Sequence, residues 1–449
     1  MTKPASQESI QRLYEDMRKT ISSSFNLLHS TLYTYSQLEQ ITEKTKNNNL
    51  HAIDAYKNLL ELYAYLLYGN IVLSAFLRAS WRSTTSIEKR FNLKYIVFLT
   101  TELYKAINGK KGIWKKIQNA FASDGMNIYI VDIEDKQNKF SRTYCTMNDK
   151  EYRDLAVHYD ENPNKVYEFL CALSEDFEVK RVSSFLEITN AYSNLVTHLS
   201  LMILEPNSNP NEGFIIENEI ILGDASGKMY SFLGDQIAAM SQRLNEKQWL
   251  YSLPKVVEAQ FGVAGVSTQI SDFFNMAHLG MHIHLLYLDM AIAIRAYLSS
   301  DSSIEKAIHL ARLNLITYEG VRKIYTKGTD SFWQKCIVDS ISSKDFIAQR
   351  EVNDIESLLS FASENRFLFD AEFRHNYAHI RKGRINRLPF LLKRLQQLDA
   401  VSELKRPLLL LKLLPRIMQL HKTALITAGE EYNAKLKTQQ YKAIQDLKF

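Results

Sequence analysis

The sequence has few of the residues that build disulfide-rich or turn-dense proteins. It contains only three cysteines in 449 residues, Cys145, Cys171 and Cys336, and they are widely spaced. An odd and scattered set excludes a disulfide framework and a cysteine-based zinc site, and indicates reduced thiols in the cytosol. The 15 glycines and 8 prolines are too few for an all-β protein of this length, so their scarcity favours helices.

Targeting signals and common catalytic signatures are also missing from the sequence. Residues 1–11 are polar and lack the apolar core of a signal peptide. The most apolar run, Ala64–Leu77, is short and is interrupted by Gly69 and Asn70, so we expect no membrane span. The chain has no GxxxxGK[ST], GxSxG or HExxH pattern. We therefore predict a cytoplasmic protein without a cofactor or a resident metal.

Length and periodicity indicate two helical domains. A chain of 449 residues exceeds what one hydrophobic core usually organises, and 46% of its residues are hydrophobic. Apolar residues recur at helical spacing from Ile10 to Leu28, over 51–80, and again after a capping segment at 83–86. Almost everything after residue 235 follows the same pattern. The predicted fold class is all-α.

Two stretches depart from the helical pattern. Residues 126–146 contain two β-rich runs around a polar centre, which predicts a hairpin inserted into a helical domain. A second hairpin is predicted from 214–222 and 229–232, after the Pro- and Asn-rich linker 205–211. The predicted organisation is a helical domain over 1–204, a linker with a hairpin over 205–235, and a helical domain over 236–449.

The two halves share an ordered set of residues at a spacing of 217 positions. Arg78, Glu88, Leu93, Glu102 and Ile107 correspond in this way to Arg295, Glu305, Leu310, Glu319 and Ile324. With small shifts in loops, Trp114 then corresponds to Trp333, and Lys180 and Arg181 correspond to Lys405 and Arg406. Helical sequences of similar composition can align by chance, but agreement of this kind in constant order favours an internal duplication.

Each half contains one Arg-x4-His motif at corresponding positions. In the first half Tyr152 precedes Arg153, Asp154 and His158. In the second half Phe373 precedes Arg374, His375 and His379. A third match, Arg416 to His421, has an apolar residue after the arginine and no counterpart in the first half, so we interpret it as coincidence.

These two motifs resemble the signature of the HEPN superfamily, which is Arg, a polar residue, three variable residues and His. The resemblance implies two tandem helical bundles and a metal-independent endoribonuclease. It also implies that the two motifs meet in one composite site, within one chain or across a homodimer. A toxin or antiviral defence effector is the setting that the family suggests, with RNA as substrate and a protein antitoxin or activator as a further partner.

The chemistry of RNA cleavage suits these residues. Without a metal, one group must take the proton of the 2′-OH and another must protonate the leaving oxygen, which gives a 2′,3′-cyclic phosphate; histidine can do either. Arginine stabilises the charge that develops on the phosphate. We predict Arg153, His158, Arg374 and His379 as catalytic residues. Asp154, His375, Glu102 and Glu319 are predicted to support them, the two glutamates by ion pairs to the motif arginines.

A basic segment follows the second motif and contains Arg381, Lys382, Arg384 and Arg387. We predict that it binds RNA phosphates, although a solvated loop is an equally good interpretation of the segment alone. The first motif is followed by acidic residues, so the two halves are predicted to be unequal. Two alternatives stay open: a non-catalytic HEPN-like module that binds RNA, nucleotides or a protein, and a helical scaffold.

Overall fold

The computed structural model of the chain consists almost entirely of helices. It describes residues 7–44, 50–108, 111–121, 125–145, 151–153, 155–156, 163–203, 224–261, 268–325, 333–341, 346–364 and 387–446. Within these ranges there is no β-strand, and the predicted all-α class is confirmed.

The helices of the second half follow the same order as those of the first. The first half contains α1 (Gln7–Lys44), α2 (Leu50–Arg82), α3 (Ser86–Asn108), α4 (Lys111–Phe121), α5 (Asn127–Tyr144), α7 (Pro163–Ala172) and α8 (Glu175–Ile203). The second half contains α9 (Asp224–Phe261), α10 (Thr268–Leu298), α11 (Ser303–Ile324), the π-helix η2 (Gln334–Val338), α12 (Phe346–Glu364), α14 (Arg387–Gln396) and α15 (Ala400–Asp446). Helices α1 and α9 begin and end 217 positions apart, and α3 and α11 begin at that same spacing.

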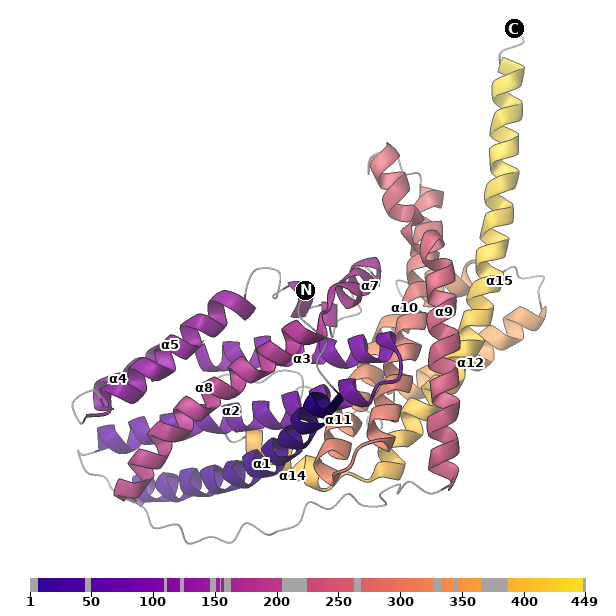
Figure 1. Cartoon of the computed structure of the whole chain (residues 1–449). Helices are drawn as coiled ribbons and strands as arrows, with labels where there is room; N and C mark the ends of the chain where they lie inside the picture. The colour runs from indigo at the N-terminus through magenta and orange to yellow at the C-terminus, as the bar shows by residue number, and fades with distance from the viewer. Residues whose placement is uncertain are drawn as a thin grey trace.

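One apolar helix lies at the centre of each half. Helix α2 packs against α1, α3, α4 and α8, and α10 packs in the same way against α9, α11, η2 and α15. The halves meet where α3 packs on α10 and α2 packs on α11 (Figure 1). Both central helices are long and apolar enough to cross a membrane by composition, but their most apolar windows are 100% and 94% buried inside this fold.

Helices α3 and α11 begin with the same capping box. Thr85 Oγ1 accepts a hydrogen bond from the Glu88 amide at 3.3 Å, and Glu88 Oε2 accepts one from the Thr85 amide at 3.1 Å. In the second half, Ser302 Oγ accepts from the Glu305 amide at 3.3 Å. Each cap satisfies amide groups that have no partner within their helix, which defines the start of the helix.

A glycine and a leucine exchange places between the halves. A Cβ on Gly69 of α2 would lie 2.8 Å from Leu103 of α3, and a Cβ on Gly320 of α11 would lie 2.5 Å from Leu286 of α10. Residues 69 and 286 are 217 positions apart, and so are 103 and 320. The large and small partners are therefore reversed at one corresponding helix contact, and each contact needs a glycine for the helices to approach.

The hairpin predicted over 126–146 is wrong, because residues 127–144 form helix α5. Its buried residues are Ile130, Ile133, Gln137, Phe140 and Tyr144, which recur at intervals of three and four. This face packs against α8. The β-branched Ile128 and Val131, which suggested a strand, are 72% and 47% exposed. Burial of a helical stripe therefore outweighs local β-propensity here.

The second predicted hairpin is also corrected. Residues 229–232 lie inside α9, where Leu233, Ile237, Met240 and Leu244 form a buried helical stripe. Residues 214–222 lie outside the described part of the chain. Because α9 begins at Asp224, residues 224–235 belong to the second half and are not a linker.

Candidate functional site

Two reciprocal ion pairs join the halves. Arg78 of α2 lies 2.7 Å from Glu305 of α11, and Arg295 of α10 contacts Glu88 of α3. The two arginines are 217 positions apart, and so are the two glutamates. Corresponding residues thus form the same kind of ion pair in both directions. All four side chains are almost completely buried.

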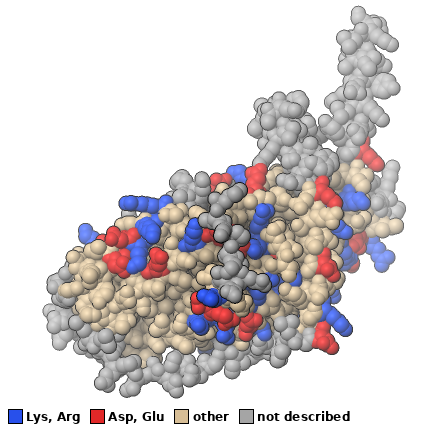
Figure 2. Space-filling model, viewed as in Figure 1, with Lys and Arg blue, Asp and Glu red and all other residues tan. Residues whose placement is uncertain are grey.

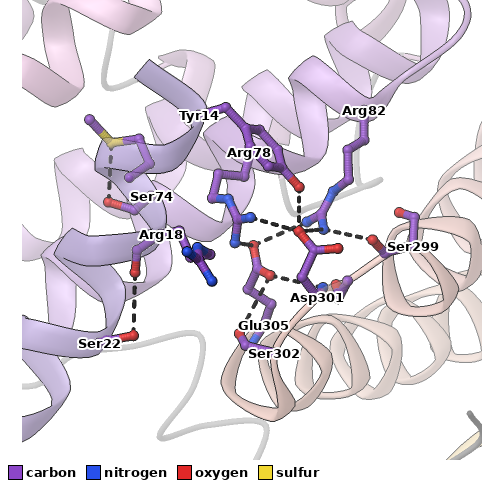
Figure 3. A network of polar contacts seen from close by, with 12 residues as sticks. Tyr14, Arg18, Ser22, Ser74, Arg78, Arg82, Ser299, Asp301, Ser302 and Glu305 are labelled. Carbon is purple, nitrogen blue, oxygen red and sulfur yellow. Dashed lines mark hydrogen bonds and ion pairs between the residues drawn. The ribbon is translucent and has the colours of Figure 1, made fainter. Parts of the chain in front are cut away.

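The Arg78 pair belongs to a wider network, which Figure 3 shows. Arg78 Nη2 also donates to Asp301 Oδ2 at 2.7 Å, and Arg82 Nη1 donates to the Ser299 carbonyl at 2.7 Å. The Tyr14 ring lies 4.1 Å from the guanidinium of Arg78. The Tyr14 hydroxyl donates to Asp301, and burial raises the pKa of Tyr14 to about 12. On the other side, Tyr230 lies 4.0 Å from the guanidinium of Arg295.

A buried polar cluster centred on Asp289 of α10 also joins the halves. Its carboxylate accepts from Arg312 at 2.8 Å, from Lys94 at 2.5 Å and from the Tyr95 hydroxyl at 3.0 Å. Arg312 and Tyr95 are 217 positions apart and face each other at 4.4 Å. A residue that contacts its own counterpart is the arrangement expected at a two-fold axis. Burial lowers the pKa of Lys94.

The first Arg-x4-His motif is described in part. Arg153 Nη1 donates to Glu102 Oε1 of α3 at 3.1 Å, with side chains 24% and 12% exposed. This is the ion pair that the sequence predicted at Glu102. Tyr152, the aromatic residue before the arginine, stacks on Phe169 of α7 with ring centroids 4.8 Å apart. Asp154 and His158 lie outside the described residues.

Helix α7, which follows this motif in the sequence, lies at the junction of the halves. It begins at Pro163, five residues after His158, and packs against both α3 and α10. Its first residues, Pro163 and Asn164, are buried. Its Tyr167 hydroxyl donates to Asn245 of α9 at 2.7 Å. Helix α7 is therefore held against the second half.

The second motif lies outside the described residues. This applies to Arg374, His375, His379, Arg381, Lys382 and Arg384. The backbone of Arg387 begins α14, which packs on α11, but its side chain is not described. Glu319, the counterpart of Glu102, is described and is 7% exposed on α11. That the two motifs meet in one site thus stays a prediction.

The third Arg-x4-His match, Arg416 to His421, has a structural role. Arg416 donates to Glu351 at 2.6 Å and to Asp354 at 2.7 Å, while His421 bonds to the Met276 carbonyl of α10. This third Arg-x4-His match therefore contacts two different helices. No group of three or more metal-binding side chains occurs among the described residues.

The junction residues were visible in the sequence only as aligned positions. Arg78 and Arg295 are charges inside apolar helices at corresponding sites, and that combination is the signal for a buried ion pair. Their partners are more than 200 residues away, so no local pattern identifies them. No protein-family model matches the chain, and no curated protein or solved structure does either.

Proposed function

We propose that the protein is a metal-independent endoribonuclease with one active site assembled from both halves. The observation that carries the proposal is the bond from Arg153 to Glu102, at the start of a segment whose next helix packs across the junction onto α10. The position of α7 supports a first motif that faces the second half. We further propose that the halves arose by duplication, which the reciprocal ion pairs support.

In this mechanism the chain supplies two histidines and two arginines. His158 and His379 act as base and acid on the 2′-OH and the leaving oxygen. Arg153 and Arg374 bind the phosphate as its charge grows. Glu102 is a positioning residue: it holds one nitrogen of Arg153. A guanidinium has five N–H donors, so this bond is compatible with phosphate binding by the same side chain.

The test is incubation with single-stranded RNA in EDTA, followed by analysis of the product ends. We expect cleavage that leaves 2′,3′-cyclic phosphate and that is lost in His158→Ala and in His379→Ala. Glu102→Gln keeps an acceptor for Arg153 but removes its charge. We therefore expect the rate of RNA cleavage to fall by no more than about 10-fold. A metal requirement, or activity that survives both histidine changes, refutes the proposal.

The second candidate is a non-catalytic RNA-binding module. The same Arg153 to Glu102 bond favours binding over cleavage, because a carboxylate at 3.1 Å offsets guanidinium charge that the transition state of cleavage needs more than bound RNA does. The RNA assay separates the two candidates. Binding without cleavage in the wild-type protein supports the module and excludes the nuclease.

A further inference from the structure

One face of helix α15 is a row of exposed residues whose only charges are lysines. From Val401 to Ile426 the exposed positions on this face are Val401, Lys405, Lys412, Pro415, Gln419, Lys422 and Ile426. Their intervals of three, four and seven place them on one side of the helix. Lys405 and Lys422 are 17 residues apart, which is about 26 Å along the axis. We call Lys405, Lys412 and Lys422 the lysine row.

The carboxylates near this row are bound elsewhere. Glu403 is the only acidic residue of α15 before Glu430, and it accepts from Arg394 at 2.8 Å and from Asn314. On α12, Glu351 and Asp354 bind Arg416. Within the described part of the chain, no lysine of the row forms an ion pair with a carboxylate.

The corresponding helix of the first half lacks this row. Helix α8 aligns with α15 through Arg181 and Arg406, and its exposed positions include Asp176, Lys180, Glu187 and Thr197. Lys180 corresponds to Lys405, but a glutamate and a threonine stand where α15 has Lys412 and Lys422. On this face, α15 therefore carries three lysines, whereas α8 carries one lysine and two carboxylates.

On the face seen in Figure 2, positive and negative side chains are intermixed over the helices. Three exposed lysines spread over about 26 Å of one helix offer charge of a single sign to a polyanion. Single-stranded RNA is such a polyanion along its backbone.

We propose that the lysine row of α15 binds the phosphate backbone of an RNA substrate, and that it gives the second half of the protein the main share of RNA binding. The choice of RNA as the polyanion rests on the proposed function. On the same helix as the row, Glu403 accepts hydrogen bonds from Arg394 of α14 and Asn314 of α11. Helix α14 in turn follows the second motif.

The experiment measures binding of fluorescein-labelled single-stranded RNA to full-length protein across a salt series. The triple variant Lys405→Gln, Lys412→Gln, Lys422→Gln is expected to bind at least 10-fold more weakly at low salt. The slope of log affinity against log salt is expected to be less steep by about 2, since each lost phosphate contact contributes about 0.7 for a single strand. The matched pair is Lys405→Gln against Lys180→Gln, two exposed lysines at corresponding positions. Only the first is expected to weaken binding.

The outcomes separate this inference from the nuclease proposal. Unchanged binding by the triple variant, or equal losses in Lys405→Gln and Lys180→Gln, overturns the inference even when RNA is cleaved. Binding that depends on the row without any cleavage supports the inference and refutes the nuclease. Where cleavage occurs, the triple variant is expected to raise KM and to leave kcat within about twofold.

Discussion

Removal of Arg295 is the sharpest test of how the two halves are joined. Arg295→Met keeps the apolar stem of the side chain and deletes the guanidinium that contacts Glu88 Oε1. The other carboxylate oxygen, Oε2, still accepts from the Thr84 and Thr85 amides at 3.0 and 3.1 Å. The variant therefore leaves a buried carboxylate that has lost its cation but keeps its cap.

The expected cost follows from burial. Loss of one partner from a buried ion pair typically destabilises a protein by about 3–5 kcal/mol. Because the cap bonds to Glu88 remain, we expect Arg295→Met to cost about 3 kcal/mol. Arg78→Met removes one cation from Glu305, but Arg82 still donates to Glu305 at 3.1 Å, so we expect a similar cost of about 3 kcal/mol.

The assay is urea unfolding followed by circular dichroism, with a double-mutant cycle. The double variant Arg295→Met, Glu88→Gln is expected to lose less stability than the sum of the two single losses, by about 2 kcal/mol. The reason is that the double variant buries no unpaired charge, whereas each single variant does. The corresponding cycle of Arg78 and Glu305 is expected to have the same sign. A cost below about 1 kcal/mol for Arg295→Met, or strict additivity in both cycles, refutes the account of the junction.

Two further predictions concern packing and pH. Gly320→Ala places a Cβ 2.5 Å from Leu286 and is expected to lower the free energy of unfolding by about 1–3 kcal/mol. Leu286→Ala makes room for this Cβ, so the double variant should lose less stability than the sum of the two single variants. Additive losses in chemical denaturation would contradict the contact. Burial, with smaller effects of nearby cations, lowers the pKa of His282 to about 3. The unfolded chain therefore binds the extra proton, and stability should fall as pH drops from about 6.5 towards 3, by up to about 1.4 kcal/mol per pH unit. His282→Leu should flatten this dependence in acid unfolding curves; equal curves for the wild type and His282→Leu would contradict it.

Helix positions and caps were predictable because their causes are local. The spacing of apolar residues predicted a helix over 51–80, and α2 spans Leu50–Arg82. The capping segment at 83–86 lies where α3 begins. The ion pair between Glu102 and Arg153 was also predicted, since each half has a glutamate and a motif arginine at corresponding positions.

The sequence by itself determined the helical class and the spacing of 217 residues between corresponding positions. Only the tertiary structure decided that 127–144 is a helix, because its stripe of buried residues is stabilised by α8 rather than by local propensity. The same holds for the junction, where Arg78 and Arg295 find partners more than 200 residues away. Such pairs depend on the packing of whole helices, since desolvated charges are stable only where folding brings the opposite charge within reach.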